Sequence, residues 1–165
     1  MLIKPEGVTL FKQLKRNFRK MFRELLVYHH SSLEYRAKVL TLMVSSNDTI
    51  SACEEKALQE IACEVYENEP ERAELLVDTV KEYHEKIITD NGLDFEHLVQ
   101  QVERESRDVP RYVEKINFER LNILHQCMKE EDDIIFQQRI LEFLQMLKDE
   151  YGTKSSKKED TNGVV

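Results

Sequence analysis

Apolar residues recur every three to four positions along most of the chain, which is the spacing of amphipathic helices. No run of alternating β-branched residues, which would indicate strands, interrupts this pattern, and only 4 Gly and 3 Pro punctuate it. Charged residues make up 34% of the chain and hydrophobic residues 41%, which also suits a helical protein. The pattern predicts an all-α domain, a single bundle of six to seven helices, at residues 8–30, 33–44, 52–67, 70–91, 95–108, 111–128 and 134–151.

Residues with special backbone preferences mark where some of these helices should begin and end. Ser51 and Glu54 have the spacing of a capping box, in which each side chain satisfies a backbone amide that the helix leaves unpaired. Gly92 can take the left-handed conformation that ends a helix. We expect Gly152 to end the last helix. The polar residues 152–165 carry too few apolar groups to fold, so we expect a disordered tail there.

One sequence pattern occurs twice, in residues 36–66 and, with many substitutions, in residues 120–151. Each copy reads as a helix, a short acidic turn and a second helix, a hairpin that cannot bury its apolar face alone. Two such hairpins facing each other would form one core and bring both acidic turns into comparable positions. We therefore expect two pseudo-symmetric hairpins, in which these residues correspond at an offset of 84: Arg36 and Arg120, Val39 and Ile123, Leu40 and Leu124, Asp48 and Asp132, Ile50 and Ile134.

Charge is distributed unevenly and sets residues 1–30 apart from the bundle at residues 31–151. Residues 1–23 hold seven basic side chains against Glu6 alone, a balance of +6, so the net charge of −8 leaves −14 on the rest. An acidic body repels nucleic acid, and we expect no nucleic-acid partner.

The first predicted helix is basic on one side and aromatic on the other. Its apolar side carries Phe11, Phe18 and Phe22. Such a helix is typical of binding to an anionic membrane surface or to a protein partner. The alternative is a core helix whose outer face is basic, because a bundle needs the same apolar stripe. The candidate binding residues are Lys12, Lys15, Arg16, Arg19, Lys20 and Arg23.

The cysteines and the lack of membrane signals favour a cytoplasmic protein. Cys53, Cys63 and Cys127 form no CxxC pair, and an odd number suits a reducing compartment, where we expect free, buried, core-filling thiols. No apolar run approaches the roughly 20 residues of a bilayer-spanning helix. The N-terminus shows no signal-peptide pattern either, because its first helix is studded with charge.

The first acidic turn resembles a family signature. Residues 47–55, with the sequence NDTISACEE, resemble the D-G-x-I-S-x-x-E signature of the TerB-like (tellurite resistance protein B) helical domain, which is also found in DjlA-type membrane co-chaperones. Residues 131–134, EDDI, resemble the second, degenerate turn of that family, and the resemblance covers residues 20–151. It implies a small helical bundle that acts as a scaffold in bacterial stress-response complexes near the inner membrane.

The resemblance also implies a weak divalent-cation site, for calcium or magnesium, at the paired acidic turns. The sequence departs from the family pattern, since Asn47 replaces an Asp, Asp48 replaces a Gly, and Gln138 stands where the second turn should match Glu54. Each amide removes a charge that hard cations favour. The alternative is that the acids only cap helix starts. The implied ligands are Asn47, Asp48, Glu54, Glu55, Glu131, Asp132 and Asp133.

No enzyme signature accompanies these turns. The chain lacks a Gly-rich phosphate loop, G-x-S-x-G and HExxH, and His84, His97 and His125 lie on different predicted helices. We expect a non-enzymatic interaction or scaffold module, with the basic helix at the cytoplasmic membrane surface or on a partner. Two alternatives remain open: a divalent-metal-binding protein or metal-dependent hydrolase that uses the acidic turns, and a helical adaptor without any ligand.

Overall fold

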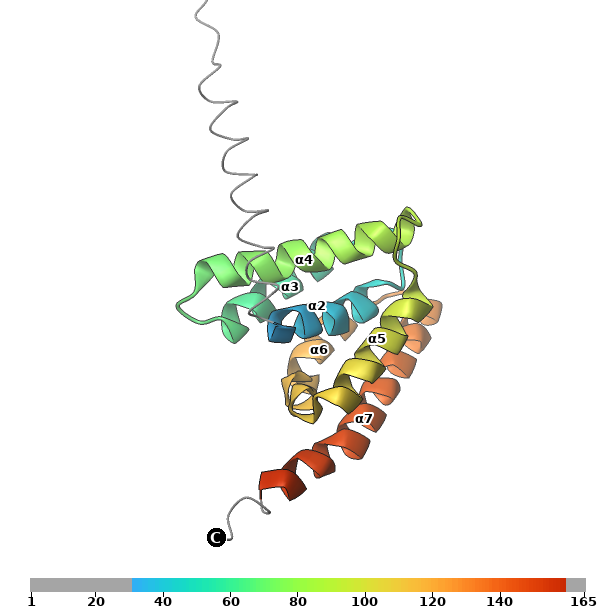
Figure 1. Cartoon of the computed structure of the whole chain (residues 1–165). Coiled ribbons are helices and arrows are strands. Elements are labelled where there is room, and N and C mark those ends of the chain that lie inside the picture. The colour runs from blue at the N-terminus through green and yellow to red at the C-terminus, as the bar shows by residue number, and fades with distance from the viewer. Residues whose placement is uncertain (1–30, 160–165) are drawn as a thin grey trace, which may run out of the picture. The chain divides into compact units, whose positions relative to one another are not determined.

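A computed structural model of the chain describes residues 31–159 (Figure 1). Within this range the protein consists of six α-helices and one 3-10 helix, η1, and contains no strand, which confirms the all-α prediction. None of these helices combines the length and the apolar character that crossing a bilayer requires. The elements are α2 (Ser31–Val44), α3 (Ala52–Val65), α4 (Pro70–Ile88), α5 (Phe95–Asp108), η1 (Pro110–Lys115), α6 (Phe118–His125) and α7 (Glu131–Glu159).

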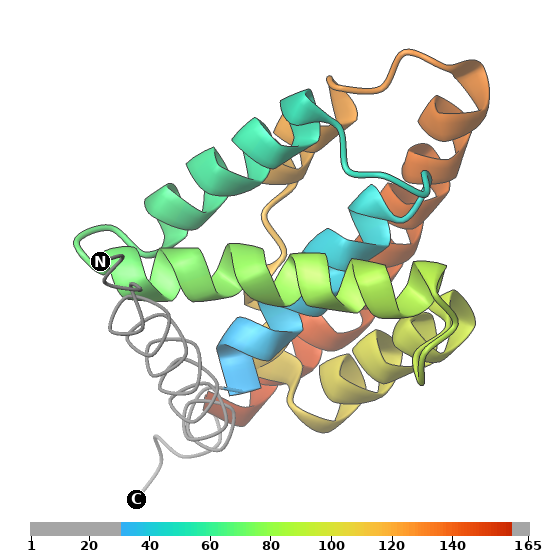
Figure 2. The ribbon, with the colours of Figure 1, turned by 90° about the horizontal axis from the view of Figure 1, so that it is seen from above.

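Helix α2 is the central element, and the other helices surround it (Figures 1 and 2). Its residues from Val39 to Val44 are all buried, so its second half has no solvent-facing side. A helix that is buried on all sides must be apolar on all sides, and the sequence VLTLMV meets that condition with Thr41 as its one polar residue. The Thr41 hydroxyl is satisfied locally, because it donates to the Ala37 carbonyl at 2.7 Å.

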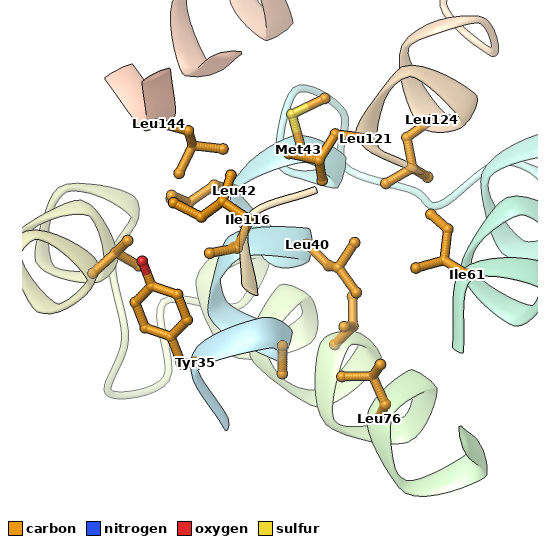
Figure 3. Close-up of a cluster of buried hydrophobic side chains, with 14 of the residues drawn as sticks. Tyr35, Leu40, Leu42, Met43, Ile61, Leu76, Ile116, Leu121, Leu124 and Leu144 are labelled. Atoms are coloured by element: carbon orange, nitrogen blue, oxygen red, sulfur yellow. The ribbon is translucent and has the colours of Figure 1, made fainter. Parts of the chain in front are cut away.

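The core is a single cluster to which every helix of the described region contributes. In Figure 3, Leu40 of α2 points to the side of Ile61 and Leu76, which come from α3 and α4. Leu42 points to the side of Leu144 from α7. One central helix thus fixes the places of elements that are distant in sequence.

The predicted pseudo-symmetry of the two hairpins is not confirmed. The first copy supplies two helices of 14 residues each, whereas the second supplies α6 with 8 residues and α7 with 29. Helix α3 packs against α4 and α6. Leu40 and Leu124 are both buried in the core, and Ile50 packs against it from a partly exposed position. Ile134 is half-buried but is not among the residues packed on this core.

Three predicted helix boundaries are wrong. The helix expected over residues 111–128 is divided, because Asn117 caps a new helix by accepting a hydrogen bond from the Arg120 amide at 3.1 Å. Gly152 does not end α7, which continues to Glu159. A glycine ends a helix only where the backbone turns left-handed. Gly152 has no positive φ. Helix α4 ends at Ile88, before the expected end at Asn91 and Gly92, and the left-handed residue at its end is Asp90, with φ of +52°. Residues 160–165 of the predicted tail lie outside the described part of the chain.

Candidate functional site

The two acidic turns of the sequence lie next to each other in the fold. The Asn47 side-chain amide, in the first turn, donates a hydrogen bond to Asp133 Oδ2, in the second, over 3.1 Å. The backbone carbonyl of Asn47 accepts a hydrogen bond from His84 Nε2 at 2.8 Å, which ties the first turn to α4 as well. Asn47, which the sequence suggested as a weak ligand, therefore acts as a connector. We call this region the turn junction, made of Asn47, Ser51, Cys53, Glu54, Cys127, Asp133 and Gln137.

A disulfide joins the two sides of the turn junction covalently. Cys53, at the start of α3, is bonded to Cys127, which follows α6, over an S–S distance of 2.09 Å and 74 residues of sequence. Cys63 is free and exposed. The expectation of three free, buried thiols is therefore wrong, because Cys53 and Cys127 are bonded and Cys63, although free, is exposed. Cysteine spacing alone could not reveal the pair, because a disulfide depends on which chain segments the fold brings together.

Glu54 is the most unusual group of the turn junction. Its side chain is only 1% exposed, and its Oε2 atom is buried without a hydrogen-bond partner among the described residues. Burial raises the pKa of this carboxyl to about 7, hydrogen bonding with the Ser51 side chain lowers it, and the nearby charge of Asp133 raises it further. Glu54 therefore exchanges its proton near neutral pH, far above the ordinary range of a carboxylic acid.

Both helices that start at the turn junction carry an acid at their third position. Ser51 caps α3 by accepting a hydrogen bond from the Glu54 amide at 3.1 Å, which confirms half of the predicted capping box. Glu54 and Asp133 are the third residues of α3 and α7. Acids in a first turn are stabilised by the positive end of the helix dipole. The repeat offset of 84 pairs Glu54 with Gln138 instead, and Gln138 is exposed, so the structure does not confirm that correspondence.

Gln137 is a site residue that the sequence reading missed. Its side chain is fully buried, and its amide donates to the Met43 carbonyl at the end of α2 over 2.9 Å. Its Oε1 atom lies 3.0 Å from His125 Nδ1 and can only accept, so His125 is the donor. One buried amide thus links α2, α6 and α7. The sequence feature that could have indicated this site is a glutamine among the apolar residues of α7.

The structure does not gather the seven predicted cation ligands into one group. Asp48, Glu131 and Asp132 are exposed, and Glu55 is paired with Lys81 Nζ at 2.6 Å. Among residues 31–159, no three or more His, Cys, Asp or Glu side chains lie close enough to hold a metal ion. The donor chemistry also fits poorly, since the Asn47 amide presents its nitrogen to Asp133. The cation site stays a prediction from the sequence.

The six candidate binding cations of the first predicted helix lie outside the described residues. No protein-family model matches the chain, and no curated protein or solved structure matches it either. The resemblance to the TerB-like domain therefore continues to rest on residues 47–55 and 131–134.

Proposed function

We propose that the protein is a non-enzymatic interaction or scaffold module, of the TerB-like stress-response type, that binds a basic protein partner through the turn junction. The observation that supports this best is the joining of two acidic turns by the Cys53–Cys127 disulfide and by the hydrogen bond between Asn47 and Asp133. Together these bonds hold acids from distant parts of the sequence in one place.

The acids around the turn junction are available to a partner. Asp48, Glu130, Glu131 and Asp132 are all exposed, and no salt bridge within residues 32–152 involves any of them. Exposed charges of one sign raise the rate of encounter with a surface of the opposite sign and select against like-charged partners. A docking surface is also more effective when it is rigid before binding, and the disulfide supplies that rigidity.

Removal of the exposed acids around the turn junction should abolish capture of the partner. The test variant carries Asp48→Asn, Glu131→Gln and Asp132→Asn. The matched control removes three exposed acids elsewhere, with Glu60→Gln, Glu103→Gln and Glu142→Gln. Immobilised full-length protein is incubated with native lysate, and retained proteins are quantified by mass spectrometry. We expect proteins held by wild type and control but lost from the test variant. Equal retention by all three proteins would exclude this surface.

The basic N-terminal segment, which the sequence predicts to form a helix, is the second binding element that we propose. Each cation near an anionic lipid surface contributes roughly 1 kcal/mol, which salt weakens. Wild type should sediment with anionic vesicles at low salt and be released as salt rises. The change of Lys15, Arg16 and Arg19 to Glu should abolish sedimentation.

A matched charge reversal elsewhere in the chain distinguishes binding by the basic N-terminal segment from an effect of the protein's net charge. The control changes the exposed cations Lys56, Arg104 and Arg139 to Glu and should still sediment with the vesicles. If wild type stays in the supernatant at low salt, the membrane part of the proposal is wrong. Disulfides such as Cys53–Cys127 persist mainly in oxidising compartments, so this bond does not support the expected cytoplasmic location. The proposed location at the cytoplasmic side of the membrane therefore rests on the charge pattern of the N-terminal segment alone.

A further inference from the structure

The Cys53–Cys127 disulfide lies where solvent can reach it. Cys53 is exposed in the first turn of α3, and Cys127 is half-buried in the loop between α6 and α7. A thiolate breaks a disulfide by attacking one of its sulfur atoms, so access decides whether the folded protein reacts. Exposed disulfides are accordingly the labile ones. The position of Cys53 allows a thiol to attack this bond without prior unfolding of the chain.

The two cysteines differ in the room around them. Cys127 packs against the hydrophobic core, where an added group would force its neighbours apart. Cys53 lies on the exposed side of α3, so a group added there extends into solvent. Cys127 Sγ also lies 3.7 Å from the Ile123 carbonyl oxygen, which a free Cys127 thiol can use as its acceptor. Both observations favour attack on Cys53 and release of Cys127.

The disulfide is the strongest tie between the loop of residues 126–130 and distant parts of the fold. Among residues 32–152, the hydrogen bond that reaches this loop from afar runs from Ser46 Oγ to Met128 Sδ at 3.7 Å, and sulfur is a weak acceptor. The other backbone hydrogen bonds of the loop stay within residues 122–134. The start of α7 is held separately, by the bond between Asn47 and Asp133. Opening the disulfide should therefore release the loop and leave α7 in place.

The remaining cysteine cannot open this disulfide within its own chain. Cys63 follows Cys53 by ten residues on α3. A helix rises 1.5 Å per residue, so the two residues are about 15 Å apart along the axis. Disulfide exchange requires direct contact between the attacking and the attacked sulfur. The thiol that reacts with Cys53 must come from another molecule.

We propose that the Cys53–Cys127 disulfide is a thiol-exchange site, which small thiols open in the folded protein by attack on Cys53. The attacking thiolate bonds to Cys53 Sγ, the bond between the two cysteines breaks, and Cys127 leaves with the electron pair and takes a proton from water. A second thiolate then displaces Cys53 from the mixed disulfide. Two thiols are oxidised to one disulfide, and the protein gains two electrons and two protons. This inference does not depend on partner binding at the turn junction.

The effect of urea on the reduction rate tests whether the folded protein reacts. Oxidised full-length protein is treated with dithiothreitol and quenched at intervals with N-ethylmaleimide, and loss of the bond is followed by mass spectrometry. Below the unfolding transition we expect a rate that is proportional to dithiothreitol and unchanged by urea. Cys63→Ser, the control, should react at the same rate. Reaction through the unfolded chain would accelerate about fivefold or more per molar urea, and that result would overturn the proposal.

Two variants show which cysteine accepts the added group. One carries Cys127→Ser and the other Cys53→Ser, both with Cys63→Ser, and circular dichroism confirms that each is folded. Each is incubated with the disulfide of 2-mercaptoethanol, and adduct formation is followed by mass spectrometry. We expect Cys53 to react several-fold faster than Cys127, because it is the more exposed. Equal rates, or faster reaction of Cys127, would overturn the assignment to Cys53.

The wild-type chain provides the same information if either variant is unfolded. Oxidised protein is treated briefly with 2-mercaptoethanol, trapped with N-ethylmaleimide and digested with trypsin. The mixed disulfide should appear on the peptide of residues 39–56, and the alkyl group on that of residues 121–129. The reverse distribution would contradict attack on Cys53.

Hydrogen exchange shows what opening the bond releases. Oxidised wild type is compared with wild type reduced by dithiothreitol, at short labelling times that report local opening. We expect faster exchange in residues 126–130 after reduction, while the buried residues 39–44 of α2 stay protected. Identical exchange of the loop in both forms would show that the disulfide does not hold it.

Discussion

Removal of the Cys53–Cys127 disulfide should lower the free energy of unfolding by about 4 kcal/mol, because the bond closes a long loop in the unfolded chain. The two cysteines are separated by 74 residues, so the cross-link removes much of the conformational entropy of that chain. The test variant carries Cys53→Ser and Cys127→Ser. Chemical denaturation compares its free energy of unfolding with that of oxidised wild type.

Cys63→Ser is the matched control for this experiment, because Cys63 is exposed and free. We expect the control to differ from wild type by less than about 0.5 kcal/mol, as surface substitutions do. Wild type treated with reductant should be as stable as the double variant. A double variant as stable as the control would show that the two cysteines are not bonded in the protein.

Stability should also fall as pH rises from about 4.5 to about 7, through the titration of Glu54. Its pKa of about 7 in the folded state lies above its ordinary value of 4.5, so the folded protein keeps a proton that the unfolded chain has lost. Protonated Glu54 therefore contributes its full stabilisation below the pKa of the unfolded chain, and this contribution to the free energy of unfolding is lost as pH rises through the pKa of the folded protein. This difference between the two pKa values corresponds to a change of about 3 kcal/mol in the free energy of unfolding.

The change Glu54→Gln should remove this pH dependence, because an amide has the same shape and stays neutral. Urea denaturation at several pH values gives the free energy of unfolding of the variant minus that of wild type. We expect this difference to grow in favour of the variant between about pH 4.5 and 7, and to level off above that. Glu60→Gln, on the exposed side of α3, should give no such trend. A flat difference for Glu54→Gln would mean that Glu54 is ionised at ordinary carboxylate pH.

Local signals in the sequence were enough to predict most helices. The 3.6-residue spacing and the preferences of Ser51 and Pro70 gave helix starts that the structure shares, whereas Gly92 placed the end of α4 beyond its observed end at Ile88. Such signals act over a few neighbouring residues, so a single chain is sufficient to find them. The division of residues 111–128 by Asn117 was missed because an asparagine within an apolar spacing does not reveal whether it caps a helix or lies on its surface.

The turn junction could be predicted only in part. The repeat suggested that two acidic turns would meet, and Asn47 does contact Asp133. The sequence could not show which acid would be buried, since Glu54 and Glu55 are adjacent and differ only in the direction that the helix gives them. It could not pair Cys53 with Cys127 either, because that pair depends on the packing of α3 against α6.

The most direct test of the turn junction is a map of its disulfide. Trypsin should place the cysteines in three separate peptides, residues 39–56, 57–72 and 121–129. Protein purified without reductant and equilibrated with oxidised glutathione is digested and analysed by mass spectrometry. We expect peptide 39–56 to be bonded to peptide 121–129 and Cys63 to react with an alkylating reagent or with glutathione. A bond between Cys63 and either other cysteine, or three unbonded cysteines, would contradict this expectation.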